Sequence, residues 1–182
     1  MIGIPLKEAI SLVKSSNRDD HCPWIGSENE EFRNLSTPQD KGKVGVLVYQ
    51  SFLKALGQEP EIVNAEGDIE YTDPYSGLVK DEVKTAAATM SYRKRDKKFT
   101  TKHWFNQIRP MQKSWSGIVL VAVFPNYYQI YRMKREDYFR NRIAGSAGIT
   151  SGHTGTNELD QVILVDNTSQ NSYNEWELIF EG

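Results

Sequence analysis

Hydrophobic residues recur at two spacings along this 182-residue chain, and each spacing predicts a different element. A spacing of three to four residues, which places side chains on one face of a helix, marks segments 5–15 and 43–56. Gly57 follows the second segment as a stop signal. We also expect a helix over 99–113, ending near Pro110, while the polar stretch 17–40 predicts an irregular segment.

Alternating or continuous apolar runs predict strands. The run 117–124, GIVLVAVF, is apolar throughout and rich in Val and Ile, which is typical of a strand buried on both faces. Further extended segments are expected at 60–72, 78–84, 127–133, 161–166 and 175–180, a helix at 135–143, and a loop at 145–156. The order predicts an α/β fold, a single domain over 1–182 with a central mixed β-sheet flanked by helices.

Composition adds a cellular setting to this picture. Hydrophobic residues make up 38% and charged residues 25% of the chain, as in ordinary soluble domains. No run approaches the roughly 20 apolar residues of a membrane span, and the N-terminal segment lacks the features of a signal peptide. The single cysteine, Cys22, excludes an internal disulfide. We therefore expect a cytoplasmic protein with no membrane partner.

Charge is distributed unevenly although the net charge is only −2. Residues 59–82 hold eight acidic side chains and one basic one, whereas residues 93–102 hold six basic side chains and Asp96. A second basic run covers 132–142. An acidic cluster that binds a cation, beside basic runs that bind phosphates, suits an enzyme acting on a polyanion. Two solvated surfaces would give the same pattern, so both interpretations stay open.

The two extended segments predict a hairpin across the turn DPYSG, residues 73–77. If Thr72 faces Leu78, Glu70 faces Lys80, Asp68 faces Glu82 and Glu66 faces Lys84. These charged residues then share one face, because side chains two apart on a strand point the same way. The opposite face takes the apolar side chains Ile69, Tyr71, Val79 and Val83.

This register predicts a metal site. Opposed residues have Cβ atoms about 5 Å apart, so the carboxylates of Asp68 and Glu82 repel each other unless a cation lies between them. Mg²⁺, which prefers oxygen ligands, suits this position, with the backbone carbonyl of Val83 as a third ligand. Lys84 would point at the same pocket and stabilise charge or orient water. A slip of one residue would leave only a surface ribbon with ion pairs.

The same residues resemble a known family. Asp68 is followed, after 13 intervening residues, by Glu82-Val83-Lys84, with Gly67 and Ile69 around the aspartate and Thr85 after the lysine. The order of elements, and the later stretches KHWFNQIRP and WSGIVLVAVFPNYYQIYRM, extend the similarity over about 43–135. This pattern resembles the PD-(D/E)xK nuclease superfamily, and most closely its type II restriction endonucleases.

The resemblance implies a restriction-endonuclease-like fold and a Mg²⁺-dependent endodeoxyribonuclease. Asp68 and Glu82 would be metal ligands, and Lys84 would activate or position the attacking water. The partner would be double-stranded DNA, and a homodimer would supply one active site for each strand, with residues 136–182 giving a DNA-contact loop and dimer or edge strands. Two departures stand out: Gly67 replaces the proline of the motif, and Val46 stands where many members carry a helical glutamate. Gln50 is a weak substitute for that glutamate, and Glu70 is the alternative metal acid.

DNA contacts are expected from the basic run and the predicted helix after it. The candidates are Lys94, Arg95, Lys97, Lys98, Lys102, His103, Gln107 and Arg109. A histidine on a helix is more often packed or solvated than in contact with DNA, and Arg109 is also compatible with helix capping or phosphate binding. All four tryptophans, Trp24, Trp104, Trp115 and Trp176, are expected in the core.

Two rival functions stay open. The first is a nuclease of the same superfamily that selects DNA structure, such as a junction or repair endonuclease. The second is a DNA-binding module that keeps the fold without the chemistry. The histidines and Cys22 lack the spacing of a zinc site, and the chain has no Walker loop, GxSxG or GxGxxG motif.

Overall fold

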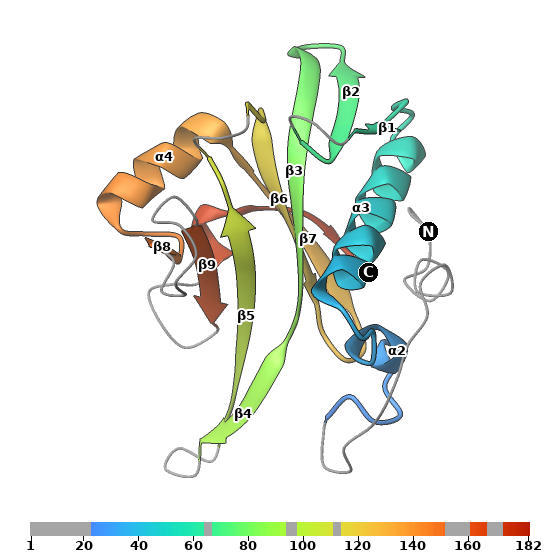
Figure 1. Cartoon of the computed structure of the whole chain (residues 1–182), viewed down its shortest axis with the longest axis vertical. Helices are drawn as coiled ribbons and strands as arrows, with labels where there is room; N and C mark the ends of the chain where they lie inside the picture. The colour runs from blue at the N-terminus through green and yellow to red at the C-terminus, as the bar shows by residue number, and fades with distance from the viewer. Residues whose placement is uncertain (1–22, 64–66, 94–97, 111–113, 152–160, 167–172) are drawn as a thin grey trace.

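Two β-sheets pack against each other in the computed structural model, with a long helix on the outer face of the larger sheet (Figure 1). The structure describes residues 23–63, 67–93, 98–110, 114–151, 161–166 and 173–182. The expected helix at 5–15 lies outside these ranges.

The larger sheet has six strands in the order β1-β2-β3-β6-β7-β10. Its central pair, β3 and β6, is parallel, and its other pairs are antiparallel, so the sheet is mixed as predicted. Every residue of β6 is buried, in agreement with the continuous apolar run. The bounds are β1 Glu61–Ile62, β2 Ile69–Asp73, β3 Gly77–Ala87, β6 Gly117–Val123, β7 Tyr128–Lys134 and β10 Glu177–Glu181.

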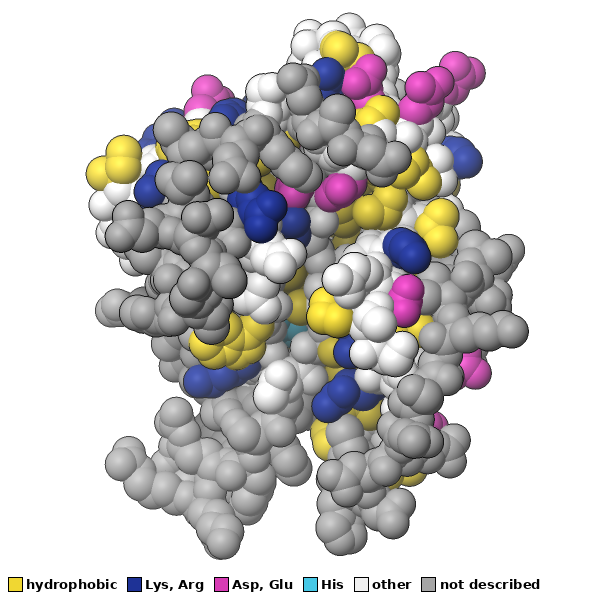
Figure 2. Space-filling model, in the orientation of Figure 1, with side chains coloured by type: hydrophobic (Ala, Val, Ile, Leu, Met, Phe, Trp, Pro, Cys, Tyr) yellow, Lys and Arg dark blue, Asp and Glu magenta, His cyan; other side chains and the backbone are white. Residues whose placement is uncertain are grey.

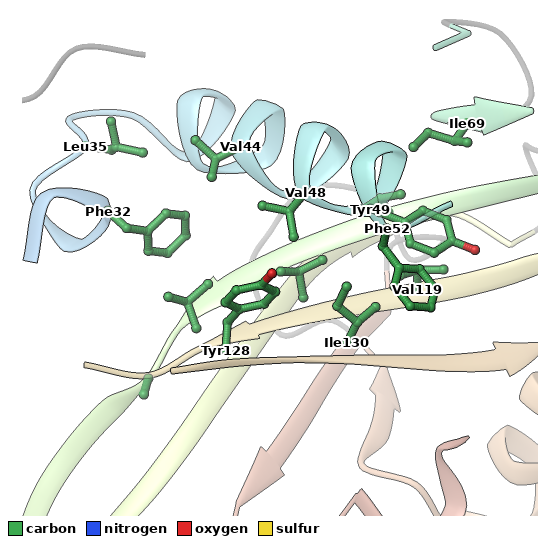
Figure 3. Packing of buried hydrophobic residues seen from close by; sticks show 14 of the residues in the cluster. Phe32, Leu35, Val44, Val48, Tyr49, Phe52, Ile69, Val119, Tyr128 and Ile130 are labelled. Atoms are coloured by element: carbon green, nitrogen blue, oxygen red, sulfur yellow. The ribbon is translucent and has the colours of Figure 1, made fainter. Parts of the chain in front are cut away.

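Helix α3, Pro38–Ala55, covers one face of this sheet after the short helix α2, Glu30–Arg33. Its apolar side packs on β3, β6 and β7, as Figure 3 shows. The helix begins at Pro38, before the predicted 43, because Thr37 caps it: the Thr37 hydroxyl accepts a hydrogen bond from the N–H of Asp40 at 3.1 Å. It ends before Gly57, whose φ of +80° provides the predicted stop.

The other face of the larger sheet is covered by the second sheet and by helix α4, Arg135–Ala144. The second sheet is antiparallel, in the order β4-β5-β9-β8. Its bounds are β4 Thr89–Arg93, β5 Lys98–Ile108, β8 Ile149–Ser151 and β9 Gln161–Asp166, and a short 3₁₀ helix, η1 Tyr173–Glu175, precedes β10. Phe105 and Ile163 of this sheet pack on Leu120 of β6 in a second core.

The predicted helix at 99–113 is wrong, because residues 98–108 form strand β5. The segment alternates instead: His103 and Phe105 are buried, whereas Trp104 and Asn106 are exposed. Such alternation, with threonines and aromatic residues, is typical of a half-buried strand. The expected loop 145–156 is also partly wrong, because Ile149–Ser151 form β8.

The α/β fold and the single domain with a mixed central sheet are confirmed. The strands at 117–124, 127–133, 161–166 and 175–180 and the helix at 135–143 appear close to their predicted bounds. Of the helices that the structure describes, none combines the length and the apolar character needed to cross a bilayer.

Candidate active-site groove

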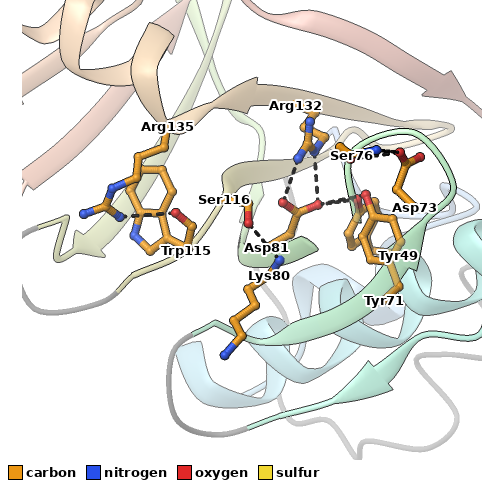
Figure 4. A network of polar contacts seen from close by, with 10 residues as sticks. All are labelled: Tyr49, Tyr71, Asp73, Ser76, Lys80, Asp81, Trp115, Ser116, Arg132 and Arg135. Carbon is orange, nitrogen blue, oxygen red and sulfur yellow. Dashed lines mark hydrogen bonds and ion pairs between the residues drawn. The ribbon is translucent and has the colours of Figure 1, made fainter. Parts of the chain in front are cut away.

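Strand β3 is fixed in the sheet by a buried ion pair of Asp81 with Arg132 of β7. Asp81 is fully buried, and its two carboxylate oxygens accept hydrogen bonds from Nε and Nη2 of Arg132, each at 3.0 Å. The hydroxyl of Tyr49 on α3 donates to the same carboxylate at 2.7 Å, and that of Tyr71 on β2 lies 3.4 Å away (Figure 4). Such bidentate pairing compensates for the removal of both charges from water.

The groups around this ion pair are buried and lie close against it. Burial, and then the nearby charge of Asp81, raise the pKa of Tyr49 well above its ordinary value, and the same two causes raise the pKa of Tyr71. Gly117 lies against the pair, and an added Cβ there would come within 2.8 Å of both Arg132 Nη2 and Asp81 Oδ1. This Asp81 network, made of Asp81, Arg132, Tyr49 and Tyr71, therefore connects α3, β2, β3 and β7.

Glu82 and Lys84 lie on the other face of β3, because successive side chains of a strand alternate. Lys84 Nζ lies 2.7 Å from Glu82 Oε1. The Glu82 side chain is only 2% exposed, and that of Lys84 is 19% exposed. A buried carboxylate needs such a partner, so the ion pair orients both groups.

Asp68, the residue directly before β2, contacts the same part of β3. One of its carboxylate oxygens, Oδ2, accepts a hydrogen bond from the backbone N–H of Val83 at 2.8 Å. Its own N–H donates to the carbonyl of Asp81 at 2.9 Å. Gly67 precedes it, and an added Cβ there would lie 3.2 Å from that carbonyl oxygen. The small residue therefore lets the chain approach β3 closely.

The predicted hairpin register is confirmed over β2, with Thr72 opposite Leu78 and Glu70 opposite Lys80. The ladder ends at the pair of Ile69 with Asp81, so Asp68 does not directly oppose Glu82 in the ladder. It reaches across to the backbone between Glu82 and Lys84 instead. Because the N–H and C=O of one strand residue point to the same side, the Val83 carbonyl also faces the side on which Asp68 lies.

A groove of about 1250 Å³ opens along β3 beyond Ile69, the residue at which β2 begins. Its floor is formed by residues 83–89, from the edge of β3 to the first residue of β4. One wall is the start of α3, and the other wall is the end of β5. Asp68 and Lys84 both line it. Figure 2 shows the furrow between the α3 side and the β5 side of the molecule, with acidic side chains visible at its upper end.

Among the residues that the structure describes, the charged side chains that line this groove are mainly basic. Four of its residues are cationic and one is acidic: Arg33, Lys41, Lys43 and Lys84 against Asp68. Burial, followed by the repulsion of Arg33, lowers the pKa of Lys41, as expected where cations gather on a partly desolvated surface. The groove is thus suited to a polyanion, with a carboxylate at one place only.

Three further candidates do not belong to this group. Glu70 Oε2 lies 3.5 Å from Lys80 Nζ in a half-exposed ion pair, so the structure gives it a cross-strand partner. Gln50 donates its amide to the carbonyl of Pro60 at 3.2 Å and does not line the groove. Thr85 borders the groove, but its hydroxyl is buried against Gly45 on the face opposite Lys84.

The structure describes some of the predicted DNA-contact residues and not others. Gln107 is exposed and lines the groove, and Lys102 and Arg109 are half-buried. Lys94, Arg95 and Lys97 lie outside the described residues, and for Lys98 the structure describes the backbone alone, as the first residue of β5.

The expected DNA contact of His103 is wrong, because this side chain is 1% exposed and lies inside the fold. Its Nε2 lies 3.3 Å from the carbonyl oxygen of Val123, and its ring packs on Phe105, Phe124 and Tyr173. Burial lowers the pKa of His103 to about 4, so the ring is neutral at pH 7.

Sequence reasoning missed two parts of the groove. Trp104 was expected in the core, but it is 52% exposed and lines the β5 wall; Trp24, Trp115 and Trp176 are buried as predicted. The cations Arg33, Lys41 and Lys43 on the opposite wall were not singled out. The alternation of residues 102–106 was the available signal for Trp104, and the Thr37-Pro38 helix start was the signal for the second wall.

The residues of the site fit a hard cation with few protein ligands. Asp68, Glu82 and the Val83 carbonyl supply oxygen atoms only, and Mg²⁺ commonly takes one or two carboxylates and keeps several waters. Within the ranges that the structure describes, there is no group of three or more His, Cys, Asp or Glu side chains arranged to hold a metal.

Comparisons with known proteins add no relative: no family model matches the chain, and no curated protein or solved structure matches it.

Proposed function

We propose that the chain is a Mg²⁺-dependent endodeoxyribonuclease that hydrolyses phosphodiester bonds in the β3 groove. The observation that carries the proposal is that Asp68, Glu82 and Lys84 all lie on, or bond to, residues 82–84 of strand β3. Asp68 is bonded to the N–H of Val83 at 2.8 Å, and Lys84 Nζ lies 2.7 Å from Glu82. Asp68 and Lys84 both line a groove in which the other charged residues that the structure describes are cations.

Asp68, Glu82 and the carbonyl of Val83 would hold the Mg²⁺ ion. When bound, the ion supplies Lewis acidity toward a phosphate oxygen and a lowered pKa for water. The protein residues have a separate task, which is to hold the two carboxylates at one place. The Val83 N–H does this for Asp68, and the Asp81 network does it for β3 as a whole.

Lys84 acts beside these carboxylates. Its side chain is 19% exposed, pairs with Glu82 and lines the same groove as Asp68. A fixed cation in a partly dehydrated site stabilises the charge that develops on a phosphate during displacement. It also donates hydrogen bonds that orient an attacking water.

The finer assignment follows the resemblance of the motif to type II restriction endonucleases. In that assignment the enzyme cuts double-stranded DNA at a specific site, acts as a homodimer with one groove for each strand, and works in the cytoplasm. Two-fold symmetry of the protein would match the symmetry of a palindromic site.

Digestion of plasmid and phage DNA at low salt tests the proposal. The wild type is compared with Lys84→Ala, in Mg²⁺ and in Ca²⁺. Lys54→Ala is the matched control, because Lys54 is an exposed lysine in the last turn of α3 that does not line the groove. We expect discrete fragments with Mg²⁺ for the wild type and for Lys54→Ala, and none for Lys84→Ala.

Other outcomes would redirect or overturn the proposal. Nicking without discrete fragments would favour a structure-selective repair or junction nuclease. No cleavage, together with DNA binding that is independent of metal, would leave a non-catalytic DNA-binding module. Equal cleavage by Lys84→Ala would remove the lysine from the mechanism.

A further inference from the structure

The β5 wall of the groove has a backbone irregularity at its centre. The ladder between β5 and β9 shifts register between Phe105 and Ile108. Within this shift Gln107 has a φ of +58°, a value that non-glycine residues seldom adopt. Such bulges turn side chains out of the regular alternation and are common beside functional sites.

The irregularity brings three side chains to one wall. In a regular strand Asn106 and Gln107 would point to opposite faces, yet both are exposed and both line the groove. Trp104, two residues before Asn106, lines the same wall and is 52% exposed. The wall therefore joins one large aromatic ring to two adjacent carboxamides.

This combination suits a nucleobase. An indole ring offers a stacking surface, and stacking of a base on an aromatic side chain is worth roughly 1–3 kcal/mol. The carboxamides of Asn and Gln both donate and accept hydrogen bonds and match the exposed edge of adenine. A base inside an intact duplex stack cannot lie flat on a protein ring, so such contact needs an unpaired or extruded nucleotide.

The opposite wall suits the phosphates of the same strand. Arg33 and Lys43 are exposed, Lys41 is half-buried, and all three line the groove on the side of α2 and α3. Lys43 is also paired with Asp40 at 3.6 Å, so the cationic character of this wall rests more on Arg33 and Lys41. An aromatic surface facing a basic wall is the arrangement of sites that hold single strands.

We infer that Trp104, Asn106 and Gln107 form a base-binding wall that takes a nucleotide unstacked from its strand. The strand's phosphates lie along Arg33 and Lys41, and its scissile bond lies toward Lys84 and Asp68. The inference rests on the proposed nuclease function and adds that the enzyme takes one nucleotide out of its double-stranded site, which costs least where that nucleotide is already unpaired.

Tryptophan fluorescence provides a direct test, because Trp104 is the exposed tryptophan and the other three are buried. The protein is titrated in Ca²⁺ with a single-stranded oligonucleotide, a duplex with one unpaired adenine and a fully paired duplex of the same sequence. We expect quenching with the first two ligands and weaker quenching with the paired duplex. Trp104→Phe should abolish the quenching but keep much of the affinity, because phenylalanine can still stack.

Trp104→Ala should weaken binding of the unpaired-adenine duplex by about ten- to a hundredfold, as measured by fluorescence anisotropy of a labelled oligonucleotide. Tyr75→Ala is the matched control, because Tyr75 is 97% exposed on the β2–β3 turn, outside the groove lining, and should bind as the wild type does. Circular dichroism of Trp104→Ala checks that the variant is folded.

The inference is overturned if a folded Trp104→Ala binds all three oligonucleotides as the wild type does, or if none of them quenches the wild type. Failure of the nuclease proposal is distinguishable, because binding is measured without Mg²⁺. Quenching without any cleavage in Mg²⁺ would overturn the nuclease proposal and support the base-binding wall. Cleavage that is unchanged in Trp104→Ala would support the nuclease proposal and overturn the base-binding wall.

Discussion

Arg132 of β7 donates hydrogen bonds to both carboxylate oxygens of Asp81 on β3, each at 3.0 Å. The two residues are 51 positions apart in the sequence, and strand β6 lies between their strands. Asp81 is the direct neighbour of Glu82, and the two carboxylates leave β3 on opposite faces. One carboxylate is therefore used to fix the strand, and the next is presented beside Lys84. The candidate site depends on a buried interaction with no role in its chemistry.

Arg132→Ala should destabilise the fold by about 3–5 kcal/mol, because Asp81 would remain buried without its cation. Urea unfolding followed by circular dichroism measures the change. Arg140→Ala is the control: Arg140 pairs with Asp137 at 2.8 Å, but its side chain is 74% exposed, so we expect a loss below about 1 kcal/mol. Similar losses in the two variants would show that the Asp81 pair contributes little.

The contact of α3 with β3 gives a second prediction. Gly45 is packed so closely on Thr85 that an added Cβ would lie 2.8 Å from the Thr85 Cβ, whereas Gly42, one turn earlier, has no atom within 4 Å of such a Cβ. Gly45→Ala should lower stability by about 1–3 kcal/mol through overpacking. Gly42→Ala should raise it by up to about 1 kcal/mol, because alanine favours helix.

Thermal unfolding of the two variants checks these opposite signs. Equal shifts of the melting temperature would mean that helix propensity alone decides both positions. Thr85→Ala combined with Gly45→Ala should recover part of the loss, because it removes the hydroxyl and the methyl group that meet the new Cβ.

The sequence predicts the local parts of this molecule well. The hairpin follows from alternation around DPYSG, and its register follows from matching Thr72 with Leu78 across that turn. The α3 helix and the buried β6 strand follow from the spacing of their apolar residues. In each case the signal lies within a short segment, where the backbone geometry of one element decides which side chains share a face.

The parts that were missed depend on contacts distant in sequence. Asp81 was one acid among eight in 59–82, and only the fold reveals that Arg132 is its partner. Strand β5 was read as a helix because its lysines and threonines obscure an alternation that pairing with β4 and β9 enforces. Without that alternation, Trp104 was expected in the core with the other tryptophans, and His103 was a candidate DNA contact.

His103 predicts a pH dependence of stability. Its pKa is lowered to about 4 in the folded protein, against an ordinary value near 6.5 in the unfolded chain. Between these values the unfolded state binds more protons, so stability rises with pH there. The free energy of unfolding that depends on neutral His103 is fully present above about pH 6.5 and is lost as the pH falls toward 4. The total loss is about 3 kcal/mol.

Urea unfolding at pH 7.0 and at pH 5.0 measures this effect, with His103→Phe as the comparison because its surroundings are aromatic. The wild type should lose more stability between the two values than the variant does. A loss of equal size in both proteins would assign the pH dependence to the carboxylates instead.

The metal ligands give the last prediction, and it separates Asp68 from the alternative acid of the same hairpin. Asp68→Asn should weaken binding of Mn²⁺, used in place of Mg²⁺ for its paramagnetism, by about tenfold or more, because the number of ligand charges sets the affinity of such sites. Glu70→Gln should leave it unchanged, since Glu70 is directed to Lys80 at 3.5 Å. Electron paramagnetic resonance of free Mn²⁺ measures both variants at equal protein concentration. If Glu70→Gln weakened binding as strongly as Asp68→Asn, the cation would belong to the outer part of the hairpin. The convergence of Asp68, Glu82 and Lys84 would then be a structural ion-pair cluster that holds the end of the β2–β3 ladder closed.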